Sequence, residues 1–148
     1  MADSSKKDTR TSTLLRKLLS SSDIEQFMAC HAGDMEVTSF HVYLNELCQA
    51  KGLVPEQVIK RAGIERTYGH QLFNETRRPS RDKVIQLAFG LALDIEGTQK
   101  LLRAAQKNLL YPKIKRDAVI LYCLKHQKDV LETQSVLQAL DLTLLGDA

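Results

Sequence analysis

The chain has 148 residues and a formal net charge of +3, and 43% of its side chains are hydrophobic, which suits one globular domain with short appendages. Its three cysteines lie far apart without a CxxC pair, which argues against a disulfide framework or a zinc site. No apolar run approaches the ~18 residues of a membrane span and the N-terminus is polar, so we expect a cytoplasmic protein without membrane contact.

The N-terminal part predicts a short disordered stretch followed by two helices. Residues 1–11 are polar and lack apolar periodicity, which predicts disorder. A helical extension is expected over residues 12–38. Its first helix has one apolar stripe, formed by Leu14, Leu15, Leu18 and Leu19. Ser22 and Glu25 fit a capping box for its second helix, which Gly33 would end.

Residues 39–93 predict a bundle of four helices. Ser39 suits the N-cap of the first helix, and Gly52 would stop that helix. Ser80 would cap the last one, which should be the central buried helix because it is apolar on most sides. The apolar residues of that helix are Val84, Ile85, Leu87, Ala88 and Leu91.

Between these helices, residues 53–80 predict two short helices joined by a tight turn. Pro55 suits the first position of a helix, because the NH that proline lacks has no helical partner there. Gly63 follows at the end of this helix, where a left-handed conformation costs glycine little. The second helix is expected to begin near Glu65 or Arg66 and to end near Glu75.

This stretch resembles the helix-turn-helix of the Cro/CI-type (Xre) bacterial and phage repressors. It fits the family pattern without a gap at Glu56, Val58, Gly63, Ile64, Arg66, Leu72, Pro79 and Ser80. The resemblance implies an all-α fold, a compact helical bundle of the lambda-repressor-like type with flanking helices. It also implies that the second helix is the recognition helix, which lies in the major groove of DNA. The segment YPKIKRDAVI resembles the extension of small bacterial Xre-like proteins and adds only a regulatory role.

The sequence departs from the family pattern at four positions. Pro55, Ile59, Gly69 and Glu75 stand where the family usually has glutamine, a small residue, an aliphatic residue and glycine. Gly69 inside the recognition helix costs roughly 1 kcal/mol relative to alanine, and Ile59 bears on how closely the two helices approach. These departures leave open a second hypothesis, a protein-interaction adaptor that keeps the fold but has lost specific DNA recognition.

Residues 94–148 predict three more helices and no internal repeat. Asp94 suits the N-cap of the first. The run AVILYCL (residues 118–124) fits either a buried strand or a helix, and we predict a helix because no partner strand is evident. Asp129 and Glu132 form a cap-like pair that would open the last helix.

This C-terminal region carries more apolar residues than two helices need to dock on a small bundle. They are Val119, Ile120, Leu121, Tyr122, Leu124, Val130, Leu131, Val136, Leu137, Leu140, Leu142, Leu144 and Leu145. An exposed excess would be an aggregation hazard, so we expect the region to supply a homodimer interface or to bind a protein partner. Alternatively, the N-terminal helices cover this surface within one chain.

The candidate site is the polar face of the second helix of the pair. If Val58, Leu72 and Phe73 face the core, the opposite face carries groups that can contact bases or phosphates: Arg66, Thr67, Tyr68, His70, Gln71 and Asn74. Neighbouring basic residues would contact phosphates and set the register: Lys60, Arg77, Arg78 and Arg81. Residues 60–116 hold thirteen Lys and Arg against five Asp and Glu, a net charge of +8, which is the footprint of a phosphate-binding face.

No catalytic, metal or cofactor site is predicted. The histidines are scattered over separate helices, and the sequence contains neither a glycine-rich phosphate loop nor an HExxH motif. We therefore predict a sequence-specific, repressor-like transcription regulator that is not an enzyme, needs no cofactor and binds double-stranded DNA as a dimer.

Overall fold

Gly63, in a left-handed conformation, joins the two short helices that the sequence predicts over residues 53–80. In the computed structural model, which describes residues 11–35 and 39–146, α5 (Pro55–Ala62) ends at Gly63 with φ +70°. The helix α6 (Arg66–Phe73) begins three residues later, and the Glu65 carboxylate accepts hydrogen bonds from the first-turn amides. It ends two residues before the predicted Glu75. The tight turn therefore forms where the sequence places it.

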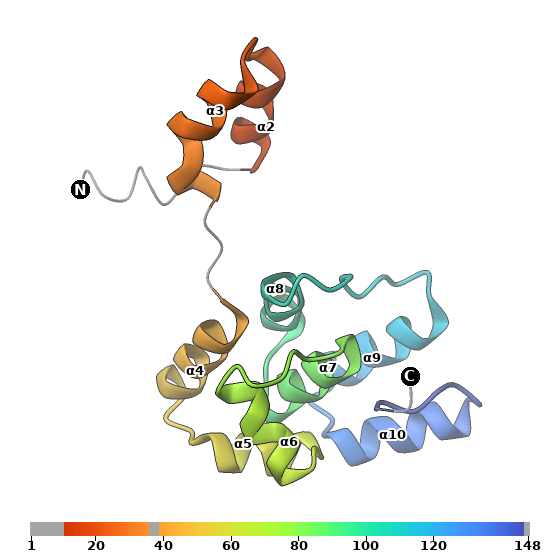
Figure 1. The fold of residues 1–148 in the computed structure, drawn as a ribbon. Helices are drawn as coiled ribbons and strands as arrows, with labels where there is room; N and C mark the ends of the chain where they lie inside the picture. The colour runs from red at the N-terminus through yellow and green to blue at the C-terminus, as the bar shows by residue number, and fades with distance from the viewer. Residues whose placement is uncertain (1–10, 36–38, 147–148) are drawn as a thin grey trace. The chain divides into compact units, whose positions relative to one another are not determined.

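The described residues form helices and no strand, so the fold is all-α (Figure 1). The other elements are α2 (Thr11–Ser20), α3 (Ile24–His31), the short 3-10 helix η1 (Ala32–Met35), α4 (Phe40–Ala50), α7 (Arg81–Gly90), α8 (Ile95–Ala104), α9 (Lys115–Lys125) and α10 (Val130–Ala139). The run AVILYCL is helical, as predicted, and Ser80, Asp94 and Asp129 each accept a capping hydrogen bond.

The chain divides into two compact units, residues 1–37 and 38–148. In the first unit Phe27 of α3 is buried, whereas α2 buries none of its residues. The N-cap of α3 is Asp23 rather than the predicted Ser22, and its carboxylate accepts hydrogen bonds from the amides of Glu25 and Gln26. The helix α3 ends at His31, two residues before the predicted Gly33, which lies inside η1. The disorder predicted for residues 1–11 lies outside the described residues except at Thr11, which is the first residue of α2.

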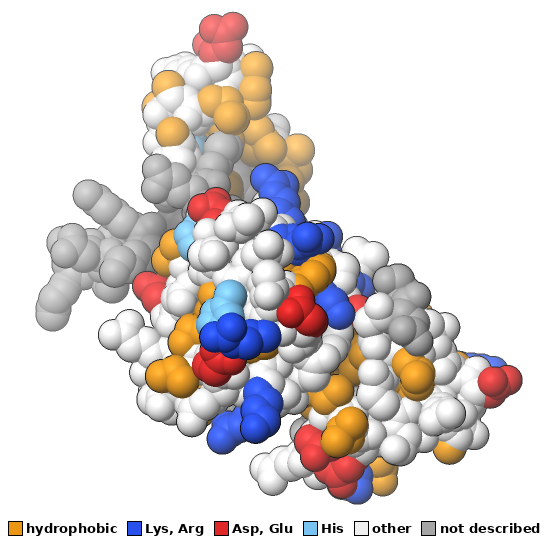
Figure 2. Space-filling model, turned by 60° about the horizontal axis from the view of Figure 1, so that its bottom comes forward, with side chains coloured by type: hydrophobic (Ala, Val, Ile, Leu, Met, Phe, Trp, Pro, Cys, Tyr) orange, Lys and Arg blue, Asp and Glu red, His pale blue; other side chains and the backbone are white. Residues whose placement is uncertain are grey.

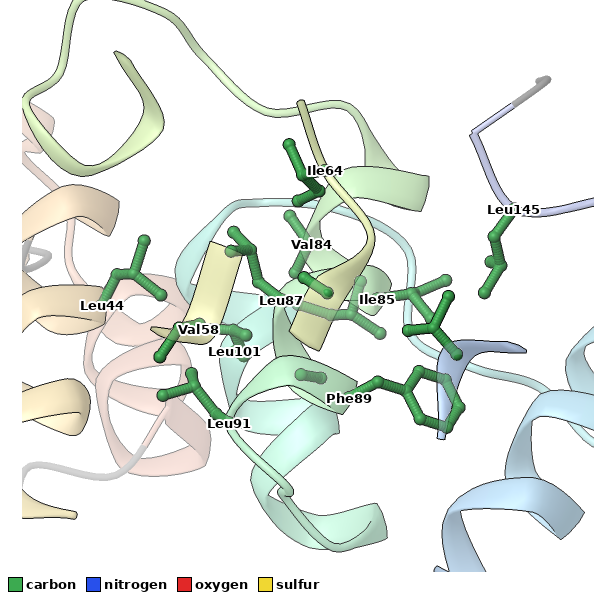
Figure 3. Packing of buried hydrophobic residues seen from close by; sticks show 14 of the residues in the cluster. Leu44, Val58, Ile64, Val84, Ile85, Leu87, Phe89, Leu91, Leu101 and Leu145 are labelled. Atoms are coloured by element: carbon green, nitrogen blue, oxygen red, sulfur yellow. The ribbon is translucent and has the colours of Figure 1, made fainter. Parts of the chain in front are cut away.

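The core of the second unit is built on α7, whose residues from Val84 to Gly90 are all buried. Figure 3 shows leucines of α7 and α8 gathered with Leu44 of α4 and Val58 of α5. Gly90 allows α5 to approach closely, because a Cβ atom at this position would lie 2.5 Å from the carbonyl oxygen of Val58. Helices α4 and α5 therefore cover one side of α7 and α8.

The prediction of no internal repeat is wrong. Residues 81–111 (repeat 1) and residues 116–146 (repeat 2) align at an offset of 35 without a gap, and eleven of 31 positions are identical. The identical pairs are Arg81/Arg116, Asp82/Asp117, Val84/Val119, Ile85/Ile120, Asp94/Asp129, Thr98/Thr133, Gln99/Gln134, Leu102/Leu137, Ala104/Ala139, Leu109/Leu144 and Leu110/Leu145. Each repeat is a helical hairpin, α7–α8 or α9–α10, followed by an extended segment.

Equivalent residues of the two repeats also have nearly equal backbone angles at the helix ends. Ala92 and Gln127, which occupy equivalent positions, both have φ +55° in the turn between the two helices of the hairpin. Gln106 and Asp141, also equivalent, have φ +58° and +59° after the second helix. All four directly follow the C-cap of a helix, as Glu75 does after α6, so equivalent helices of the two repeats end in the same way.

Two arginine–aspartate pairs join the repeats crosswise. The guanidinium of Arg81 donates to both carboxylate oxygens of Asp117 at 3.1 and 2.9 Å, and that of Arg116 donates to both oxygens of Asp82 at 2.9 and 2.8 Å. Each arginine also donates to two carbonyls in the extended segment of its own repeat, which are those of Asn108 and Leu109 or of Thr143 and Leu144. Both aspartates are buried, so these are buried ion pairs that hold the two repeats together rather than charges on the surface.

A glutamine fixes each extended segment a second time. The Gln99 side chain donates to the carbonyl of Leu110 at 2.9 Å and accepts from its amide at 2.8 Å. Gln134 makes the same two hydrogen bonds to Leu145, at the same distances. Both leucines are buried in the core. The repeat therefore conserves the side chains that hold each segment against the hairpin.

Most apolar residues of the C-terminal region are used inside the chain. Five are buried, namely Ile120, Leu124, Val130, Leu137 and Leu145, and five more are partly buried against the core, namely Val119, Leu121, Val136, Leu142 and Leu144. Only Tyr122, Leu131 and Leu140 of the predicted set are large exposed apolar residues. The large exposed excess expected from the sequence is therefore absent from residues 39–146, because the second repeat pairs with the first.

Candidate nucleic-acid interface

The inner sides of α5 and α6 are buried, as the sequence predicts. Val58, Leu72 and Phe73 all lie in the core. Gly69 is also buried and faces Ile59, so the aliphatic side chain comes from α5 rather than from α6. The opposite side of α6 therefore faces outward.

The outward face of α6 carries the predicted polar residues. Arg66, Thr67 and Asn74 are exposed, whereas Tyr68, His70 and Gln71 are half-buried. The predicted phosphate contacts beside it, Lys60, Arg77 and Arg78, are exposed too. Figure 2 brings the lower side of Figure 1 forward and shows Lys and Arg side chains interleaved with carboxylates and histidines. The face is therefore of mixed charge rather than continuously basic.

A carboxylate of α5 engages two of the predicted base contacts. Glu56 accepts a hydrogen bond from Arg66 Nε at 2.9 Å, and its other oxygen lies 2.8 Å from His70 Nε2. The hydrogen bonds from Arg66 and His70 lower the pKa of Glu56. Sequence reasoning missed this contact, since the partners are separated by 10 and 14 residues. The sequence did offer one sign of it, because Glu56 occupies an acidic position of the repressor pattern that the stretch resembles.

Tyr68 forms the centre of a second cluster on the same face. The guanidinium of Arg77 lies 4.6 Å from the centre of the Tyr68 ring, and Lys83 Nζ lies 5.4 Å from it. Arg77 Nε also donates to Gln71 Oε1 at 3.1 Å. Lys83 was not among the predicted residues, although its place in the first turn of α7, after Ser80, could have suggested it. Tyr68 thus holds two cations beside the outward face.

Arg81 does not belong to this surface, contrary to the sequence-based assignment. Its guanidinium makes four hydrogen bonds to Asp117 and to the carbonyls of Asn108 and Leu109. A cation paired bidentately with a buried carboxylate has little to offer a phosphate. We therefore remove Arg81 from the candidate interface and keep the other nine residues.

Other kinds of site find no support in residues 11–35 and 39–146. No group of three or more His, Cys, Asp and Glu side chains comes together as a metal ion would require. No helix in these ranges is both long enough and apolar enough to cross a membrane. Comparison with protein-family models, curated proteins and solved structures finds no match to this chain. The role of α6 must therefore be inferred from its own side chains and their neighbours.

Proposed function

We propose that this chain is a sequence-specific, repressor-like transcription regulator and that α6 is its recognition helix. The observation that supports this proposal is the two-helix unit of α5 and α6, which has a buried inner side and a polar outer side. Arg66, Gln71 and Asn74 lie on that outer side. The arginine fork matches the two acceptors of guanine in the major groove, and glutamine or asparagine matches adenine.

Basic side chains at both ends of this row are suited to phosphates. Lys60 lies in the last turn of α5, and Arg77 and Arg78 follow α6. All three are exposed, and Arg77 is held over the Tyr68 ring. Contacts of this kind fix the register of a helix on the duplex without selecting sequence.

A dimer is part of the proposal. One recognition helix of eight residues covers only a few base pairs. Regulators of this architecture therefore place two recognition helices about one DNA turn, roughly 34 Å, apart. We expect the chain to bind a palindromic duplex as a homodimer.

An interaction adaptor is the second candidate, and the position of Glu56 favours it. Its carboxylate lies on the outer face and occupies donors of Arg66 and His70 that DNA would need. A carboxylate there also repels phosphate groups. An adaptor would keep this arrangement permanently, whereas a DNA-binding protein must exchange these contacts for bases.

The deciding experiment measures binding of the full chain to random duplex DNA at several salt concentrations. DNA binding through phosphates releases counterions, so affinity should fall steeply with salt. The pair Arg77→Ala and Arg78→Ala should reduce the slope of log affinity against log salt by about 2. Lys107→Ala, in the loop after α8, removes a charge outside the two-helix unit and should leave the slope unchanged. Absence of binding even at low salt would favour the adaptor.

Sequence recognition is tested by selecting binding sites from random duplexes. Arg66→Ala and Gln71→Ala should each relax the preference at one position, at a cost of roughly 1–3 kcal/mol for the preferred base. Arg77→Ala should weaken all sequences alike. An unchanged selected motif with Arg66→Ala would exclude this residue as a base contact.

A further inference from the structure

The two helices of the N-terminal unit leave most of their apolar side chains exposed. Leu15 and Leu19 of α2 are 51% and 75% exposed, and Ile24 and Met28 of α3 are 58% and 48% exposed. Phe27 is the only buried residue of these two described helices. Figure 2 shows hydrophobic side chains on the surface of this unit, at the top of the view. Two amphipathic helices with so small a core need further cover for their apolar side.

The exposed apolar residues form one strip along each helix, because residues four apart share a side of an α-helix. We call the four residues of the two strips the hairpin face: Leu15, Leu19, Ile24 and Met28. Lys17 stands two residues from each leucine and therefore lies on the opposite side of α2. Gln26 lies opposite the strip of α3 for the same reason. Each helix thus has an apolar side and a polar side.

Both strips lie on the same side of the helix pair. In α2 the half-buried Leu14 and Leu18 each precede an exposed leucine, and in α3 the buried Phe27 precedes Met28. The strips are therefore displaced from the buried side of each helix in the same rotational sense. The chain turns back over residues 21–23, so the two helices run in roughly opposite directions (Figure 1). In antiparallel helices this displacement places both strips on one face.

The charges beside the two strips have opposite signs. The helix α2 contains two basic residues and no acidic one, whereas α3 contains one acidic residue and no Lys or Arg. The exposed Arg16 lies three residues from Leu19, and the exposed Glu25 lies three residues from Met28, so each charge borders its strip. A covering surface must therefore be acidic where it meets α2 and basic where it meets α3. The same two helices, taken in the reverse order, meet this requirement.

Charge and size both favour a second copy over other partners. Residues 11–31 hold two Lys and Arg against two Asp and Glu, so the pair of helices does not attract nucleic acid or an anionic membrane. The whole unit spans residues 1–37, and chains below about 40 residues usually need oligomerisation, a metal or disulfides to fold. A second pair of helices would complete a four-helix bundle, in which every apolar strip is covered.

We propose that two copies of this chain pair through their hairpin faces, with α2 of each copy lying on α3 of the other. In such a two-fold contact each pairing occurs twice, so Arg16 of each copy lies near Glu25 of the other. The four apolar residues from both copies form one shared core. This pairing supplies the dimer that the proposed function requires. It is tested without DNA, so its failure would not bear on the recognition helix α6.

The first test is sedimentation of the full chain over micromolar concentrations. The native chain should dimerise reversibly, and Leu19→Gln and Met28→Gln should each weaken dimerisation at least about tenfold because each removes apolar contacts from both copies. Leu131→Gln is the matched control, since Leu131 of α10 is 77% exposed and belongs to the other unit. It should leave the dimer unchanged.

Reversal of charges tests which helices meet. Arg16→Glu brings two acidic residues together at both contacts, and Glu25→Arg brings two basic ones together, so each variant should dimerise about fivefold more weakly. In an equimolar mixture of the two variants both contacts join opposite charges, so the mixed dimer should form in preference to either homodimer. Lys17→Glu reverses a charge on the opposite side of α2 and should have no effect. A variant that had merely failed to fold would not regain association on mixing.

Three outcomes would overturn the proposal. They are a monomeric native chain, a dimer that survives both Leu19→Gln and Met28→Gln, and a mixture of Arg16→Glu with Glu25→Arg that associates no better than either variant alone. The first would leave the hairpin face to another protein, and the second would place the dimer interface elsewhere. A dimer that weakens as predicted but never binds DNA would instead count against the proposed function alone.

Discussion

The side chain of Ile59 fills the space that a side chain at position 69 would need. A Cβ atom on Gly69 would lie 2.4 Å from Cγ2 and 2.6 Å from Cγ1 of Ile59. These residues are two of the departures from the family pattern, which has a small residue on the first helix and an aliphatic one on the second. Compared with the repressor pattern that the sequence resembles, the large and the small residue are exchanged between the two helices, so one large side chain still fills the contact. The pair therefore gives no support to the loss of DNA recognition.

The exchange predicts strong coupling between the two positions. Gly69→Ala should lower the free energy of unfolding by about 1–3 kcal/mol through overpacking, even though alanine is favoured over glycine in a helix by roughly 1 kcal/mol. Ile59→Ala should cost about 2–5 kcal/mol through the cavity it leaves. In the double variant the new methyl enters that cavity, so the combined loss should fall short of the sum by at least about 1 kcal/mol.

Urea unfolding of the native chain and the three variants measures this coupling. Thr67→Ala, an exposed change on the same helix, serves as the control and should stay within about 0.5 kcal/mol of the native chain. Additive losses would show that Gly69 and Ile59 do not compensate each other.

Local signals in the sequence predicted the elements well. Gly63 in its turn and the caps Ser80, Asp94 and Asp129 all act within four residues of their partners, so a pattern in the sequence suffices to find them. The errors there are small, such as Asp23 capping α3 in place of its neighbour. They arise because several polar residues in a row can all serve as a cap.

Contacts between residues far apart in the sequence could not be predicted in this way. Arg81 and Asp117 are 36 residues apart, and nothing near Arg81 in the sequence distinguishes an internal ion pair from a phosphate contact. The repeat was missed because its identical residues are mainly those that tie the hairpins together, spread thinly over 31 positions. Glu56 was likewise assigned to a motif position and not to the cations that it contacts.

The crosswise pairs predict matched losses of stability in the two repeats. Arg116→Ala leaves the buried carboxylate of Asp82 without its partner, and Arg81→Ala does the same to Asp117. Breaking a buried pair in this way costs about 3–5 kcal/mol, so both variants should unfold at much lower urea concentration. Lys115→Ala, an exposed neighbour of Arg116, should change the free energy of unfolding by less than about 0.5 kcal/mol. If Arg81→Ala lowers the free energy of unfolding only slightly, Arg81 would again be a candidate phosphate contact.

Acid should weaken the fold through Asp82. Burial alone would raise the pKa of this carboxyl, but hydrogen bonds from Arg116 and from the Gly146 amide, together with the charges of Arg116 and Arg81, lower it below its ordinary value of 3.8. A carboxyl whose pKa is lower in the folded than in the unfolded chain stabilises the fold above its unfolded pKa. That contribution is lost as pH falls through the folded pKa. Stability should therefore decline below about pH 4.

Urea unfolding at a series of pH values isolates this contribution. Asp82→Asn removes the titrating group, so the variant should be less stable near neutral pH and lose less stability on acidification. Glu46→Gln changes an exposed carboxyl of α4 and should leave the slope intact. An equally steep acid decline in Asp82→Asn would assign the effect to other carboxyls, such as Glu56 and Glu65, whose pKa values are also lowered.

The contact between Glu56 and the recognition helix predicts a gain of DNA affinity on removing its charge. Glu56→Gln keeps the shape of the side chain but releases Arg66 and His70 from an ion pair and removes repulsion of phosphate. Exposed pairs of this kind are weak because water screens the charges, so affinity for random duplex should rise by no more than about fivefold. Glu75→Gln changes another exposed glutamate near this face, which pairs with His41 instead, and should raise affinity less.

The outcome also separates the two candidate functions. If α6 binds DNA, Glu56 competes with the duplex for Arg66, and the gain in Glu56→Gln should disappear when Arg66 is replaced by alanine as well. If the gain persists in Glu56→Gln with Arg66→Ala, the carboxylate acts only by general repulsion and Arg66 makes no contact with the duplex. If neither variant nor the native chain binds DNA at low salt, Glu56 belongs to a surface built for another protein. Fluorescence titration of the native chain, Glu56→Gln, Arg66→Ala and the double variant at one low salt concentration distinguishes these cases.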